Sequence, residues 1–209
     1  MNTNDFKPLE YNPETCWEFI FKHQKEIFLE YLKVEKSHWN ENDFSIDCLE
    51  DQTTFKDFGY RIIEELTEAT TDTVHPDHFL EEIVDALNFL VELMLIYGWD
   101  EKKLPQWVPM SVNPKHDFPW WLNVGGKHSL NAETYAVVEA IGLCNNTLKN
   151  RLWKNSHYLV DLYVFEPRLK DIWAQFNKYV NGLGISEKLL FETWSTKYQV
   201  NLFRRESLY

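Results

Sequence analysis

Four acidic residues at helical spacing are the side chains of this sequence best suited to hold a metal ion. Glu65 and Glu68 lie in the segment EELTEA, and Glu82 and Asp85 lie in EEIVDALNFLVEL. Each pair is spaced i,i+3, so its two carboxylates project from one side of a helix. Four carboxylates that meet between two helices repel one another unless they hold a hard cation such as Mg²⁺. The pattern therefore predicts a metal-dependent enzyme that acts on phosphates.

The alternative is that these acids form the solvated faces of two amphipathic helices. Two features of the sequence favour a site. The acids have few Lys or Arg residues four positions away, so they would make a poorly salt-bridged surface. Asn88 and Phe89 follow on the second acidic helix and indicate a wall rather than bulk water.

The elements that must position these residues are helices. Apolar periodicity, together with Pro and Gly at the expected ends, predicts helices over residues 14–36, 55–71, 77–97, 131–150, 166–182 and 186–205. Gly98 is expected to cap the third helix. Residues 99–130 are rich in Pro, Trp and Gly and are expected to form an irregular insertion, in which Trp107 to Trp121 make a lid, a dimer contact or a core cap. The expected fold is a single all-α domain over residues 1–209, a bundle of about six main helices.

Composition and charge narrow the classes of function. The 209 residues carry a net charge of −12, which disfavours a nucleic-acid polymer as partner. The longest apolar run, ALNFLVELMLIYGW, is interrupted by Asn88 and Glu92 and is too short to span a membrane. Three cysteines without metal-like spacing are typical of reduced thiols, and no signal peptide is recognisable. We expect a cytoplasmic protein of a bacterium or of an infected host cell.

The acidic pairs also match a known signature. EELTE followed by EIVD resembles the EExxE…ExxD signature of the all-α nucleoside triphosphate pyrophosphatases, which include the MazG-like enzymes and the dimeric dUTPases. The following segment, DALNFLVELMLIYGWDEKK, looks like the aromatic-rich helix of the dimeric dUTPase and phage dCTPase branch. TLKNRLWKNS (147–156) and the closing KYQVNLFRRESLY are similar to further motifs of that branch.

This resemblance implies a reaction and a cofactor. A pyrimidine deoxynucleotide, dUTP or dCTP, would be hydrolysed to the monophosphate and pyrophosphate when water attacks the α-phosphorus. Mg²⁺ is the implied cofactor, and a homodimer is the implied assembly. The implied metal ligands and catalytic carboxylates are Glu65, Glu68, Glu82 and Asp85, with Glu65 or Glu68 taking the proton.

Several polar residues are expected to bind the nucleotide. Lys197, Asn201 and Arg204 share one face of the last helix with Leu190 and Trp194, so they should point inward and hold a triphosphate. Their alternative role is to compensate the helix dipole. Further phosphate contacts are expected from Lys149, Arg151 and Lys154.

The base and sugar have their own candidates. Gln24 lies on the apolar stripe of the first helix, and by the resemblance it reads the pyrimidine edge; the alternative is a buried amide satisfied by backbone. Phe28 stands where the family usually has a second polar residue, so the preferred base stays open. Asn88 is expected to contact the sugar, and Tyr209 to stack on or bond to the nucleotide. His75 and His78 are expected to be linker residues rather than ligands.

Two other functions compete with this one. A MazG-like enzyme with purine or broad specificity would use the same acids. An acidic interaction protein without enzymatic activity, such as a DNA mimic, would fit the charge of −12 but would not need the inward-facing Lys197, Asn201 and Arg204.

Overall fold

In the computed structural model, which describes residues 6–34, 43–71, 76–108, 132–151 and 153–206, every regular element is a helix. The predicted all-α class is therefore confirmed. The elements are α1 (Cys16–Val34), α2 (Leu49–Thr71), α3 (Pro76–Ile96), the short 3-10 helix η2 (Glu101–Lys103), α4 (Ala132–Thr147), α5 (Leu162–Gly182) and α6 (Glu187–Glu206).

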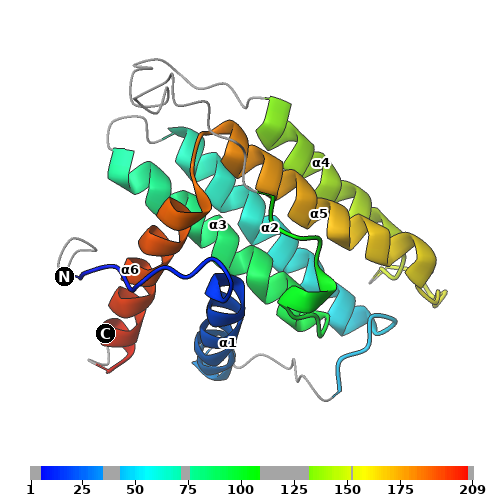
Figure 1. Ribbon diagram of the computed structural model, residues 1–209. Coiled ribbons are helices and arrows are strands. Elements are labelled where there is room, and N and C mark those ends of the chain that lie inside the picture. The colour runs from blue at the N-terminus through cyan, green and yellow to red at the C-terminus, as the bar shows by residue number, and fades with distance from the viewer. Residues whose placement is uncertain (1–5, 35–42, 72–75, 109–131, 152, 207–209) are drawn as a thin grey trace.

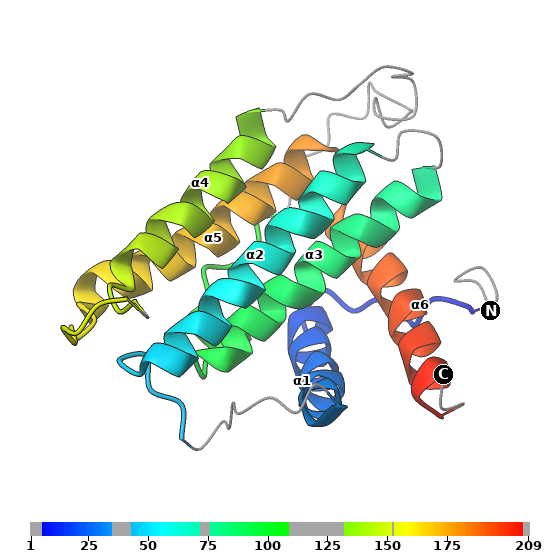
Figure 2. The same cartoon turned by 180° about the vertical axis from the view of Figure 1, so that it is seen from behind.

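Four helices form a bundle, and two helices lie against one side of it. The most extensive packing is between α2 and α3 and between α4 and α5. Figures 1 and 2 show these four helices lined up along one direction, with α1 and α6 both on the α3 side of the bundle. The N-terminal segment follows α6, where the backbone N–H of Leu9 donates to Ser195 Oγ at 3.0 Å. Because α1 and α6 both lie on the α3 side of the bundle, the region between them is bordered by α1, α2, α3 and α6.

The helix α3 is central because its sequence is apolar on most sides. Ile83, Leu87 and Leu90 are fully buried, and so is Met94. An aromatic cluster closes the core beside α1 and α5, where the ring of Trp107 lies 4.5 Å from that of Trp17. Trp107 therefore caps the core, while residues 109–121 of the Trp-rich segment lie outside the described residues.

Two helices begin earlier than their sequences indicated. The sequence predicts a start at residue 55, whereas α2 begins at Leu49, and Gln52 in its first turn is fully buried, donates to Ile46 O at 2.8 Å and accepts from the backbone N–H of Asn150. The helix α5 begins before Pro167, because Asp161 caps it by accepting from Tyr163 N at 3.0 Å. In both cases a polar side chain finds a partner that a local pattern does not reveal.

The end of α3 follows the sequence closely. Gly98 has a φ of 80°, and the N–H of Trp99 donates to Met94 O at 2.9 Å, which closes the last turn as in a Schellman motif. The predicted cap is therefore confirmed. Among the described residues, α3 and its neighbours included, no helix combines the length and apolar character that crossing a bilayer requires.

Candidate functional site

Three of the four predicted metal ligands come together between α2 and α3. One carboxylate oxygen from each of Glu65, Glu82 and Asp85 lies within 4.8 Å of the others. Glu82 is buried, and Glu65 and Asp85 are partly buried. The fourth residue, Glu68, is exposed one turn further along α2. This arrangement follows from the i,i+3 spacing in α3 and from the close packing of α3 against α2.

The cluster holds more negative charge than its surroundings balance. Burial, a hydrogen bond to Glu82 and the charges of Asp85, Glu82 and Glu68 together raise the pKa of Glu65 to about 8. The pKa of Asp85 is also raised, because burial outweighs the opposing effect of Lys197. At neutral pH a proton on Glu65 therefore reduces the repulsion among the clustered carboxylates. A bound cation would reduce the same repulsion.

Two positively charged or ionisable groups touch the cluster. Lys197 extends from α6, forms an ion pair with Asp85, and donates to Glu81 O at 3.1 Å. His78, in the first turns of α3, places its Nε2 3.2 Å from Glu82 Oε1. The basic residue predicted to face inward from the last helix does so, and its partner is one of the predicted metal ligands.

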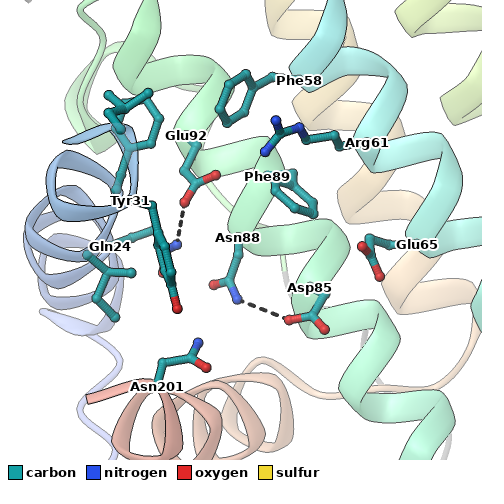
Figure 3. Close-up of a pocket in the computed structure, with 13 residues that line it drawn as sticks. Gln24, Tyr31, Phe58, Arg61, Glu65, Asp85, Asn88, Phe89, Glu92 and Asn201 are labelled. Carbon is teal, nitrogen blue, oxygen red and sulfur yellow. Dashed lines mark hydrogen bonds between the residues drawn. The ribbon is translucent and has the colours of Figure 1, made fainter. Parts of the chain in front are cut away.

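A pocket of about 290 Å³ adjoins the acidic cluster. Its walls come from α1, α2, α3 and α6, and Figure 3 shows Asp85 and Glu65 toward one end and Gln24 and Glu92 toward the other. Asp85 and Glu92 are seven residues apart on α3, which separates them by about 10 Å along the helix axis. The pocket therefore has an acidic end and a second polar end.

The second end is built from amide and carboxyl groups. Gln24 Nε2 donates to Glu92 Oε1 at 2.8 Å, and only 4% and 5% of these two residues is exposed. Asn88 lies between the two ends, where its Oδ1 accepts from Trp194 Nε1 at 3.0 Å. Its Nδ2 points toward Asp85 Oδ1 at 3.4 Å (Figure 3).

Aromatic rings and one guanidinium group form the α2 side of the pocket. Arg61 lies over the rings of Phe58 and Phe89, 4.8 Å and 5.6 Å from their centroids, and its Nε is 3.0 Å from Asp57 Oδ2. Phe58, Arg61 and Glu65 occupy successive turns of one helix face, as their i, i+3 and i+7 spacing requires. Tyr31, which is half exposed, lines the opposite wall.

Other residues predicted to bind the nucleotide are distributed more widely. Gln24, Asn88 and Asn201 line the pocket, and Arg204 lies exposed about one turn beyond Asn201 on α6. Lys149, Arg151 and Lys154 lie in the connection from α4 to α5, on the other side of the bundle from α6 (Figure 1), and do not line this pocket. Tyr209 and His75 lie outside the described residues.

Two charged residues that line the pocket, Glu92 and Arg61, are not among the residues that the sequence predicts for the site. Glu92 interrupts an apolar run on α3, and such a break indicates a buried polar contact. Arg61 precedes Glu65 by one turn, a spacing that places both on the same face. Both signals indicate site residues only once the faces of α2 and α3 that carry Glu65 and Asp85 are known to border a pocket.

Comparison with protein-family models, with curated proteins and with solved structures found no match to this chain. The function must therefore be argued from the site itself.

Proposed function

We propose that this protein is a Mg²⁺-dependent nucleoside triphosphate diphosphatase that hydrolyses a pyrimidine deoxynucleotide, dUTP and/or dCTP, to the monophosphate and pyrophosphate. The observation that carries the proposal is a cluster of three carboxylates, two of which line one end of a pocket that has a buried polar group at the other end. A nucleotide has the same division, with an anionic phosphate chain and a polar heterocycle. The resemblance of the acidic pairs to the all-α pyrophosphatases supports the same reaction.

The residues of the acidic end fit a magnesium ion. Glu65, Glu82 and Asp85 offer oxygen ligands within 4.8 Å of one another, and Mg²⁺ prefers carboxylate oxygens and water. The raised pKa of Glu65 supports this assignment, because the excess negative charge that raises it is the charge a cation would neutralise. When bound, Mg²⁺ would supply charge neutralisation at the phosphates and acidification of a water molecule.

The chain's own groups would bind, orient and accept a proton. Glu65 is the carboxylate best placed to take a proton from water, since it lies inside the cluster whereas Glu68 is exposed. Lys197 already lies beside Asp85 and would shift toward the phosphate oxygens when a cation replaces it as the countercharge. Asn201, one turn further along α6, lines the same pocket.

The size of the pocket favours a single-ring base. Its volume of about 290 Å³ lies just below the range for ligand pockets, about 300–1,000 Å³. The aromatic side chains of Phe58, Phe89 and Tyr31 line it. Such walls suit a flat heterocycle. As part of the same proposal, the protein is a cytoplasmic homodimer that controls the nucleotide pool of a bacterium or phage-infected cell.

The test is a substrate panel. Release of pyrophosphate is measured with Mg²⁺ from each deoxynucleoside and ribonucleoside triphosphate separately. We expect consumption of dCTP or dUTP, loss of at least a hundredfold in rate for Glu82→Gln, and full activity for Glu139→Gln, a matched change on the exposed surface of α4. Equal hydrolysis of purine nucleotides would favour the MazG-like alternative. Hydrolysis of none by folded protein would favour an acidic interaction protein.

A further inference from the structure

A second hollow, an open groove of about 570 Å³, lies between α2 and α4. Its α2 wall includes Lys56 and Tyr60, its α4 wall includes Asn145, and Arg151 lines it from just beyond the end of α4. No described residue lines both this groove and the pocket that adjoins the acidic cluster. Lys56 and Glu65 are nine positions apart on α2, which places them on opposite faces of the helix and about 14 Å apart along its axis. The groove is therefore separate from the acidic pocket.

Two cations share this groove, and both contact the same backbone carbonyl. Lys56 Nζ lies 3.5 Å from Asn150 O, and Arg151 donates through Nη1 to Asn150 O at 3.0 Å. Within the part of the chain that the structure describes, neither cation forms an ion pair with a carboxylate. Asp57 also lines the groove, but its Oδ2 pairs with Arg61 Nε at 3.0 Å. In a chain with 33 acidic and 21 basic residues, neighbouring cations without a carboxylate partner indicate a site for an anion from outside the chain.

The electrostatics of the two cations support an anion site. Burial and the positive charge of Arg151 lower the pKa of Lys56 to about 8, and an anion held between the two side chains would offset both effects. A guanidinium group carries five N–H donors, and the hydrogen bonds that Arg151 makes to described residues all leave from Nη1. The alternative role of the two cations is to compensate the dipole at the end of α4. That role leaves the other donors of Arg151 unused.

The rest of the groove fits a nucleotide better than a bare phosphate. Tyr60 lies one turn from Lys56 on the same face of α2, and it is 59% exposed, so its ring is free to stack on a base. Asn145 lines the α4 wall, and its Oδ1 is buried with no hydrogen-bond partner among the described residues. A ligand that carries an N–H or O–H donor would satisfy this oxygen. The volume of about 570 Å³ lies within the range for ligand pockets, about 300–1,000 Å³.

We propose that this groove is a second nucleotide-binding site, in which the phosphates lie between Lys56 and Arg151 and the base lies against Tyr60. Arg151 does not line the acidic pocket, so this ligand is distinct from the substrate whose phosphates the resemblance assigns to Arg151. The inference does not rest on the proposed function, because binding in the groove requires neither the acidic cluster nor hydrolysis. Free pyrophosphate shares the phosphate chemistry of a nucleotide, and the experiment below distinguishes the two.

The first experiment measures acetylation of individual lysines by mass spectrometry in the wild-type protein without metal, with dATP or pyrophosphate added. With a pKa of about 8, Lys56 is about half unprotonated at pH 8 and therefore open to acetylation. We expect saturating dATP to slow acetylation of Lys56 by roughly fivefold or more and to leave Lys188, exposed on α6, unchanged. Protection by pyrophosphate at equal or lower concentration than dATP would overturn the assignment to a nucleotide. No protection of Lys56, or protection of Lys197 alone, would overturn the site.

The second experiment measures the affinity for dATP by calorimetry, again without metal. Lys56→Gln removes one charge-assisted hydrogen bond to phosphate and should weaken binding by about tenfold. Lys188→Gln is the matched control, because it removes the same charge from an exposed lysine on α6, and it should bind dATP as the wild-type protein does. Equal weakening in the two variants would show only a general attraction of the anion and would overturn the site. Where Lys56→Gln fails to fold, the protection of Lys56 in the wild-type protein decides.

Discussion

Binding of Mg²⁺ to the acidic cluster should displace a proton from Glu65, and this coupling can be measured. The ordinary pKa of the side chain is 4.5, and the cluster raises the pKa to about 8. At pH 7 a group with that pKa is about 90% protonated, so each bound ion should release about 0.9 proton. At pH 9 the release should fall to about 0.1 proton.

The same competition fixes how affinity changes with pH. From pH 8 to pH 7 the apparent affinity for Mg²⁺ should weaken about fivefold, and from pH 7 to pH 6 by about a further ninefold. Isothermal titration calorimetry in buffers of different ionisation enthalpy measures both the affinity and the protons released. In Glu65→Gln, which has no proton to lose at this position, both quantities should become nearly independent of pH between 6 and 8. Affinity that stays constant from pH 6 to pH 8 in the wild-type protein would refute the reasoning.

The free energy of unfolding of the metal-free protein should decrease as pH rises, whereas the affinity for Mg²⁺ increases. Because the pKa of Glu65 is higher in the folded than in the unfolded chain, the folded state binds more protons between pH 4.5 and about 8. The contribution of protonated Glu65 to stability is therefore complete below pH 4.5 and is lost as pH rises through about 8. Thermal denaturation should show a rise in Tm on adding Mg²⁺ that is larger at pH 8 than at pH 6.

Three substitutions test separate parts of the account. Lys197→Met removes the cation that competes at Asp85, so calorimetry should show tighter Mg²⁺ binding by severalfold while turnover falls at least tenfold; weaker binding would contradict this. Gly98→Ala forces a side chain into the left-handed region and should lower the free energy of unfolding, measured with denaturant, by about 1–2 kcal/mol. Gly142→Ala is the control, because an added Cβ meets open space there in α4, and it should be neutral or stabilising. Equal losses of stability in the two variants would contradict the role of Gly98 as a left-handed cap. Lys154→Ala should leave KM unchanged, since Lys154 does not line the pocket; a large rise in KM would return it to the site.

Three of the four predicted carboxylates lie together, while Glu68 does not, and the part that could be predicted follows from helical spacing, which is a local property. Apolar periodicity predicts the two helices that carry Glu65, Glu82 and Asp85. It also predicts the apolar faces by which these helices pack together. Lys197 was predicted to face inward by the same argument, since it continues the stripe of Trp194. Its ion pair with Asp85 needed the additional knowledge that α6 packs against α3.

The remaining features depend on contacts between distant segments. The early start of α2 relies on Gln52, which is satisfied by Asn150, 98 positions away in the chain. The position of the α4–α5 connection likewise depends on Asn150, whose amide donates to Asp47 O and Tyr158 O. Local pattern could not reveal these bonds, so it could not show that the basic residues of this connection lie away from the pocket. Glu92 was overlooked for the same reason, because its partner Gln24 is 68 positions away.

The most direct test of the central claim is to locate the oxygen that water contributes to the products. Hydrolysis of the preferred triphosphate with Mg²⁺ in ¹⁸O-labelled water, followed by ³¹P NMR or mass spectrometry, distinguishes attack on the α-phosphorus from attack elsewhere. We expect one ¹⁸O in the nucleoside monophosphate, none in pyrophosphate, and loss of the reaction in Glu82→Gln. Label in pyrophosphate or in inorganic phosphate, or a rate that Glu82→Gln leaves unchanged, would contradict it.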